Sequence, residues 1–168
     1  ENKMDVDDIR ILIDKYIVDY LYNAARIEGL DTKYLDTKLF VEDGIIPNNI
    51  SEDKILILKN LKDAYKALKD SEFLNMHIDI LSLCKVNQII NGRGLVKEAG
   101  YIRHDPVYIL NSKYVPDLPD EFQINNDIID MTELDEEPLD IAIKLYLYVM
   151  RKQPFIDGNK RTAVIFAN

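Results

Sequence analysis

Apolar side chains recur every three or four residues along most of this chain, and that spacing places them on one face of an α-helix. The first run covers residues 5–27, where Val6, Ile9 and Ile13 follow the pattern before Gly29 provides a stop. The same spacing predicts helices over residues 36–43, 51–69, 74–91 and 138–153, and a last helix from Asn159 onward. The sequence therefore predicts a mainly α-helical fold.

One region departs from the helical period. Residues 107–110 and 114–115 are two short apolar runs around Asn111-Ser112-Lys113, bracketed by Pro106 and Pro116. Apolar runs separated by a polar turn predict a small β-hairpin, and proline is tolerated at its edges. The acidic residues that follow, up to position 136, are expected to form loop with a helical turn or two.

Length and composition narrow the class of protein. A chain of 168 residues is the size of one domain, and its single cysteine, Cys84, excludes an intramolecular disulfide framework. No apolar run approaches the ~18 residues of a membrane helix. The net charge of −9 disfavours nucleic-acid and anionic-lipid partners. We expect a cytoplasmic protein with no membrane association.

The charge is unevenly distributed along the sequence. Residues 117–140 hold ten acidic residues and no lysine or arginine. Residues 151–168 hold four cations and one acid, a net charge of +3. The acidic stretch is typical of a solvated surface, with docking of a basic target protein as the alternative. The positive charge of residues 151–168 needs an explanation from the local sequence.

That explanation lies in the turn formed by Asp157, Gly158 and Asn159, where Asn159 is expected to cap the last helix. Lys160 and Arg161 then fall in the first helical turn, where each cation costs about 0.3–1 kcal/mol against the helix dipole. A bound anion would make the two cations favourable at this position, because free backbone N–H groups, the helix dipole and two cations together form a phosphate site. Asp157 beside it is a candidate ligand for Mg²⁺. The alternative is a solvated cap with two exposed cations.

These residues resemble the Fic motif, H-x-F-x-[DE]-G-N-G-R-x-x-R, of the Fic/Doc family. Matching residues are Phe155, Asp157, Gly158, Asn159 and Arg161, while Lys160 replaces a glycine, as in Doc-like members with N-K-R-T. Upstream, Gly100-Tyr-Ile-Arg103, Val107-Tyr-Ile109 and Tyr114-Val-Pro116 resemble the flap hairpin that aligns the target segment. Thr37–Gly44 and Lys59–Ala64 resemble the family's N-terminal helices.

The resemblance implies a helical Fic domain with a small β-hairpin flap, spanning residues 1–168 as a single domain. Its N-terminal helices would occupy residues 5–69 and its core residues 74–168. The apolar helical pattern still runs at Asn168. We therefore expect the last helix to continue beyond it and the chain to be truncated at that end.

The resemblance also implies a function. Family members typically transfer AMP from ATP to a hydroxyl group on a target protein, so the expected cofactors are ATP and Mg²⁺ and the expected partner carries a Ser, Thr or Tyr hydroxyl. Asp157 would carry Mg²⁺. The nucleotide-binding residues would be Gly158, Asn159, Lys160, Arg161 and Thr162, with Asn159 and Arg161 on the phosphates, and the flap would include Val107, Tyr108 and Ile109. Family members often form homodimers, and the resemblance leaves a homodimer open.

Two positions depart from the motif. Gln153 occupies the place of the histidine that acts as general base, and a carboxamide cannot accept a proton near neutral pH. Loss of a general base typically costs about 10²–10⁴ in rate. Val164 occupies the place of the second arginine, which normally contacts the nucleotide phosphates. The sequence thus leaves three interpretations: a weakened adenylyltransferase, a Doc-like protein phosphotransferase, or an inactive Fic-fold protein that binds a nucleotide or a partner.

A second segment resembles the family's inhibitory motif, [ST]-x-x-x-E-[GN]. It runs from Ala24 to Gly29, with alanine in the Ser/Thr place and Glu28 in the place of the inhibitory glutamate. In the family this glutamate pairs with the second arginine, which here is Val164. Glu28 is therefore a regulatory candidate that would turn to Arg161, or else a solvated residue at the end of its helix.

Overall fold

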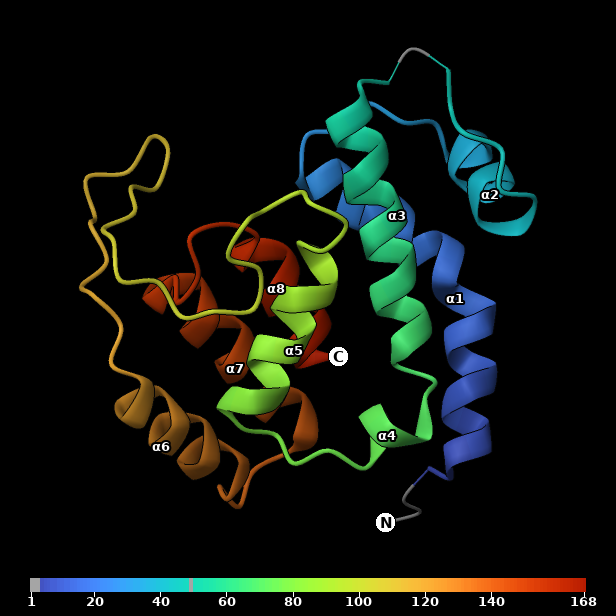
Figure 1. Cartoon of the computed structure of the whole chain (residues 1–168). Coiled ribbons are helices and arrows are strands. Elements are labelled where there is room, and N and C mark those ends of the chain that lie inside the picture. Colours follow the sequence, from blue (N-terminus) through green and yellow to red (C-terminus); the bar gives the residue numbers. More distant parts are fainter. Residues whose placement is uncertain (1–3, 49) are drawn as a thin grey trace. The chain divides into compact units, whose positions relative to one another are not determined.

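The computed structural model describes residues 4–48 and 50–168, and within them the chain is mainly helical (Figure 1). The helices are α1 (Val6–Ile27), α2 (Tyr34–Glu42), α3 (Glu52–Ala67), α4 (Ser71–Leu74), α5 (Ile80–Ile90), α6 (Glu121–Thr132), α7 (Pro138–Lys152) and α8 (Asn159–Ala167). The chain divides into two compact units, Glu1–Met76 and His77–Asn168. The predicted mainly α fold class is confirmed.

In the first unit, α1 packs against α2 and α3. The rings of Tyr20 and Tyr65 stack with their centroids 5.2 Å apart, which joins α1 to α3. Tyr65 is buried, and this burial raises the pKa of its phenol. The Nζ atom of Lys62 on α3 donates to the carbonyls of Phe40 and Val41 at 2.9 and 2.8 Å, which caps the end of α2.

The second unit is built around one apolar core. Helix α8 packs against α7 and α5, and α6 contacts both α7 and α5. The core residues are Leu83, Ile102, Ile124, Ile128, Leu145, Val149, Phe155 and Ala163. A fully buried side chain of leucine, isoleucine, valine or phenylalanine contributes about 1.5–3 kcal/mol relative to exposure. Phe155 is the core member that comes from the α7–α8 connection, so this core anchors the segment that the sequence singles out.

Two predicted boundaries in this unit need correction. The helix predicted over residues 74–91 begins at Ile80, because Asp79 and Ser82 form a capping box that fixes the start more than a turn later. The acidic stretch contains the 12-residue helix α6 instead of a turn or two. Its buried Ile124 and Ile128 stand four residues apart and face the core, while most of its acidic residues remain on its outer face.

The predicted β-hairpin is wrong in its secondary structure. Val107, Tyr108 and Ile109 lie in a connection that forms no strand within the described residues, and Figure 1 draws this α5–α6 connection as a long coil. The chain does reverse, because the Ser112 amide donates to the Ile109 carbonyl at 3.1 Å and Asn111 adopts a left-handed φ of 61°. Residues 104–117, called the flap segment below, therefore turn back without a ladder of paired backbone groups.

In the described part of the chain, each helix is too short or too polar to cross a bilayer.

The capping box of α5 gives a direct test of this unit. Replacing Asp79 by alanine removes the acceptor for the Ser82 amide, and the loss of such a cap costs about 0.5–2 kcal/mol. Asp79→Ala should therefore lower the free energy of unfolding by about 1 kcal/mol in urea titrations. Glu137→Ala is the matched control, because Glu137 is the N-cap residue of α7 but makes no capping hydrogen bond through its side chain. Equal losses in the two variants would contradict the assignment.

Candidate functional site

The residues that match the motif lie on the connection between α7 and α8. We call residues 153–158 the motif loop. Gln153 ends α7 in the left-handed conformation, with φ 47° and ψ 59°. Its side-chain Nε2 donates to the Met150 carbonyl at 2.7 Å, so the carboxamide turns back onto its own helix. The residue in the place of the family's base is thus half-buried and satisfies a helix-end carbonyl.

Asn159 closes the motif loop on itself. Its Oδ1 accepts from the Phe155 amide at 2.9 Å, and its Nδ2 donates to the Phe155 carbonyl at 2.7 Å. The expectation that Asn159 caps α8 is wrong: Gly158 is the N-cap residue and Asn159 is the first residue of the helix. The side chain turns back to Phe155 because both polar backbone groups of that buried residue need partners.

Two asparagines from α5 and its end hold the other end of the loop. Asn87 donates to the Asp157 carbonyl at 3.1 Å and to the Thr162 hydroxyl at 3.0 Å, and its Oδ1 accepts from the Gly100 amide at 2.9 Å. Asn91, the C-cap residue of α5, donates to the same Asp157 carbonyl at 2.9 Å. Both asparagines are essentially inaccessible to solvent. The carbonyl of Asp157 is therefore fixed by two side chains from a neighbouring helix.

These asparagines were not among the predicted site residues. A signal for them exists in the sequence, since Asn87 and Asn91 stand four residues apart on a helix whose buried face is otherwise mostly apolar. Buried amides require partners, and the pattern therefore points to backbone or polar groups that pack on α5. The pattern does not identify the groups that accept or donate these hydrogen bonds.

Gly158 is required by two separate constraints. Its φ of 73° lies in the left-handed region, which glycine adopts without a steric penalty. A Cβ at this position would also lie 2.7 Å from both Nδ2 and Oδ1 of Asn91. The chain thus passes close against the amide of Asn91 as it enters α8.

The start of α8 combines an exposed carboxylate with a buried cation. The Asp157 side chain is 59% exposed, and its Oδ2 lies 3.4 Å from Nη2 of Arg161, whose side chain is 4% exposed. Oδ1 of Asp157 accepts from the Gly158 amide at 2.6 Å. Lys160, the next residue along α8 from Asn159, is half-buried. Positive charge from Arg161 and the helix dipole therefore lies behind an outward-facing carboxylate.

This donor set fits a magnesium ion that is shared with phosphates. Mg²⁺ in nucleotide sites is commonly held by one or two carboxylates together with phosphate oxygens and water. Asp157 supplies one accessible carboxylate, and the described residues contain no cluster of three or more His, Cys, Asp or Glu side chains that would bind a metal alone.

The remaining predicted residues lie in different surroundings. Thr162 is fully buried behind the loop, where its hydroxyl accepts from Asn87. Val164 is half-buried further along α8. In the flap segment Tyr108 is exposed, whereas Val107 and Ile109 are half-buried. Glu28 belongs to the first unit, where it is the C-cap residue of α1.

Arg103 connects the flap segment to the motif loop. Its Nε donates to the Gln153 carbonyl at 2.6 Å, and Nη2 donates to the Asp117 carbonyl at 2.7 Å. Its Nη1 donates to the Asp105 carbonyl at 2.9 Å. The residue is 2% exposed, and this burial lowers the pKa of its guanidinium below the usual value. The sequence points to Arg103 only as part of the flap pattern and gives it no role of its own.

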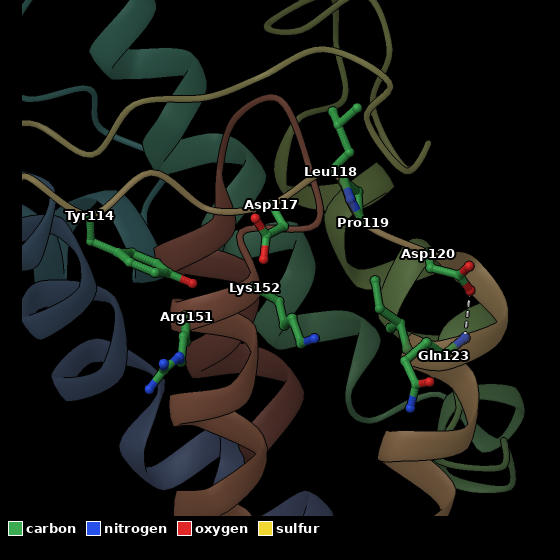
Figure 2. A pocket seen from close by; sticks show the side chains of 9 residues that line it. Tyr114, Asp117, Leu118, Pro119, Asp120, Gln123, Arg151 and Lys152 are labelled. Atoms are coloured by element: carbon green, nitrogen blue, oxygen red, sulfur yellow. Dashed lines mark hydrogen bonds between the residues drawn. The ribbon is translucent and has the colours of Figure 1, made fainter.

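A pocket of about 260 Å³ lies beside this link, between the end of the flap segment, the start of α6 and the end of α7 (Figure 2). Its lining residues are Tyr114, Asp117, Leu118, Pro119, Asp120, Gln123, Ile124, Arg151 and Lys152. Arg151 lies over the Tyr114 ring, 5.7 Å from its centroid. Asp120 is turned to the Gln123 amide, as the dashed line in Figure 2 marks, at 2.8 Å.

The close approach at Gly158 is testable. Gly94→Ala is the matched control, because Gly94 has a φ of 79° and a Cβ added there would meet nothing within 4 Å. Its cost should be the left-handed penalty alone, about 1–2 kcal/mol. Gly158→Ala should cost about 1–3 kcal/mol more, since the methyl group must displace Asn91. Equal urea midpoints for the two variants would show that Asn91 yields freely.

Comparison with solved structures identifies the fold. The chain aligns with Fic-1 from Caenorhabditis elegans at 23% identity and a TM-score of 0.75, covering 100% of this chain and 51% of that one. A Fic family protein from Desulfovibrio desulfuricans aligns at 19% identity and 0.77, covering 93% and 47%. A Fic domain containing signaling protein from Bacteroides thetaiotaomicron aligns at 21% identity and 0.76, covering 99% and 66%.

The chain thus spans about half the length of the first two of these relatives, and identities this low show a shared fold alone. No curated protein matches the sequence significantly. The model of the Fic/DOC family matches residues 71–168, which include α5 to α8, the flap segment and the motif loop. Members of that family generally transfer nucleotide or phosphate groups to proteins. With more than half of its length matched, this chain belongs to the Fic/DOC family.

Proposed function

We propose that the motif loop binds ATP with Mg²⁺ and supports transfer of AMP to a hydroxyl group of a target protein, at a rate that Gln153 lowers. The observation that carries this proposal is the start of α8, where the exposed Asp157 carboxylate lies 3.4 Å from the buried Arg161 guanidinium. The proposal assigns the metal to Asp157 and the nucleotide phosphates to Arg161, Lys160 and the first amides of the helix. A bound Mg²⁺ would neutralise charge on the phosphates.

The loop geometry supports this assignment because side chains of the chain itself hold the loop. Asn87 and Asn91 fix the Asp157 carbonyl, and Asn159 fixes both backbone groups of Phe155. Amides and charges that need no reorganisation stabilise a developing anion better than flexible ones. We call the proposed phosphate-binding groups at the start of α8 the phosphate cradle. We assign Asn87, Asn91 and Asn159 to its support.

Gln153 is the reason to expect slow chemistry. In AMP transfer the acceptor oxygen bonds to the α-phosphorus, pyrophosphate leaves, and the acceptor proton must go to a base or to water. The Gln153 carboxamide can accept a hydrogen bond from the acceptor hydroxyl but not its proton. Its Nε2 already donates to the Met150 carbonyl. We infer that it orients the acceptor and leaves the proton to solvent.

Two other functions remain as alternatives. Lys160 in the place of the motif glycine favours a Doc-like reaction, in which phosphate is transferred and ADP is released instead of pyrophosphate. Gln153 favours a protein that binds a nucleotide or a partner without transfer. The released product separates the first alternative from AMP transfer, and restoration of the base separates the second.

We also propose a regulatory role for Glu28. Its segment resembles the family's inhibitory motif, and Glu28 is half-buried at the end of α1. A carboxylate at a helix C-terminus is unfavourable by about 0.3–1 kcal/mol. That cost is consistent with a specific role for this residue over a purely structural one.

Calorimetric titration of Mg·ATP tests the nucleotide site. We expect micromolar affinity, about −8 kcal/mol, and a loss of at least tenfold in Asp157→Asn. This variant removes the charge but keeps an acceptor for the Gly158 amide. Asp130→Asn, on the exposed face of α6, is the charge-matched control and should bind as the wild type does.

Equal affinities for Mg·ATP in Asp157→Asn and the wild type would remove Asp157 from the metal site. If the wild type binds no nucleotide, the titration is repeated with Glu28→Gly. Recovered binding would support the inhibitory role of Glu28, and a second failure would leave the family fold as an interaction scaffold.

The missing base gives a second test. Gln153→His should raise the rate of AMP transfer, to the chain itself or to an added acceptor, by about 10²–10⁴-fold. Mass spectrometry of the modified chain and assay of pyrophosphate against ADP identify the group transferred. A Gln153→His chain that binds Mg·ATP and still transfers neither AMP nor phosphate would contradict the adenylyltransferase proposal and favour the non-catalytic alternative.

A further inference from the structure

We propose that Arg103 is a positioning residue that ties the flap segment to the motif loop, so that the acceptor-aligning and nucleotide-binding parts of the site keep one arrangement. The inference rests on the proposed function for what each segment does. The link itself stands on the geometry of one buried side chain.

The contacts of Arg103 reach both segments at once. The guanidinium donates to the carbonyls of Asp105 and Asp117, which lie at the two ends of the flap segment. It also donates to the Gln153 carbonyl at 2.6 Å and to the Lys152 carbonyl at 3.4 Å. The Arg103 amide donates to the Pro154 carbonyl at 2.9 Å. A single residue therefore holds three consecutive residues where α7 passes into the motif loop.

Burial of the Arg103 guanidinium carries a desolvation cost, and its hydrogen bonds offset part of that cost. The residue is 2% exposed, and within the described chain its hydrogen-bond acceptors are backbone carbonyls, with no carboxylate among them. An unpaired buried charge is costly, and a guanidinium lowers that cost by using most of its five donors. Lysine and glutamine offer fewer donors in other directions and cannot reproduce this set.

The conformation at Gln153 shows what the link does. Gln153 combines a left-handed φ of 47° with a following proline, whereas a residue before proline normally adopts an extended conformation. Left-handed backbone is unfavourable for a residue with a side chain and persists where its surroundings fix it. Arg103 bonds to the carbonyl of Gln153 and to that of the residue after it. It thereby holds the position where the family carries its base.

The far end of the loop does not depend on Arg103. Asn87 and Asn91 hold the Asp157 carbonyl, and Asn159 holds Phe155. Loss of the guanidinium should therefore release the flap segment and Gln153, while the phosphate cradle at the start of α8 stays in place. A general loss of structure would affect both ends of the loop.

Limited proteolysis together with nucleotide titration tests this split on the full chain. Lys113 is exposed in the flap segment and provides a tryptic site between the two carbonyls that Arg103 holds. We expect Arg103→Gln to speed cleavage after Lys113 by at least tenfold, Arg103→Lys to give an intermediate rate, and both to change the Kd for Mg·ATP less than threefold. Arg103→Lys, which keeps the charge, serves alone if Arg103→Gln does not fold.

Val149→Ala is the stability control, because the side chain of Val149 lies in the apolar core and takes no part in the loop's side-chain hydrogen bonds. Cleavage rates are compared at urea concentrations that give equal free energies of unfolding. Unchanged cleavage in the Arg103 variants, or cleavage that rises equally in Val149→Ala, would overturn the link. A parallel loss of more than tenfold in Mg·ATP affinity would also overturn it, since Arg103 would then support the whole loop.

The two proposals fail in different ways. If the wild type does not bind Mg·ATP, the proposed nucleotide site fails and the cleavage comparison still decides the role of Arg103. If the wild type binds Mg·ATP but the Arg103 variants resist cleavage as it does, only the positioning role fails.

Discussion

Buried side-chain donors that bind the carbonyls of the motif loop are the interaction on which the candidate site depends. The loop has no regular structure of its own, so its polar backbone groups need partners from elsewhere. Arg103 supplies them at the entrance, and Asn87 and Asn91 supply them at the exit. Phe155 fastens the middle to the apolar core. The conformation of a six-residue connection is therefore fixed by residues distant in the sequence.

The helices could be predicted from the sequence because their signals are local. The period of apolar residues located α1, α3 and α7 closely, since each helix carries its own amphipathic stripe, and a terminating glycine or proline follows α1 and α7. The start of α5 was predicted too early because the pattern shows apolar spacing but not which polar residue closes the cap. Asp79 and Ser82 decide that point.

The site residues also divide into those that a local sequence pattern reveals and those that depend on contacts between distant parts of the chain. The motif around Gly158 was recognisable because its residues are contiguous, and the tight approach to Asn91 adds a reason for glycine that no local pattern contains. Asn159 was expected as a cap but bonds to Phe155, because Gly158 already occupies the cap position. The flap segment was expected as a hairpin from its apolar runs. Its ends are instead held by the Arg103 guanidinium, which donates to the Asp105 carbonyl nearby in the sequence and to the more distant Asp117 carbonyl.

The contact between Gly158 and Asn91 also limits how this sequence can change over time. The two residues belong to different helix ends, yet the space for a side chain at one is occupied by the amide of the other. A smaller residue at position 91 would relieve the steric conflict with a side chain at position 158, but it would leave the left-handed φ of 73° and would remove a donor to the Asp157 carbonyl. The two positions therefore form an epistatic pair, because the cost of a side chain at position 158 depends on which residue occupies position 91.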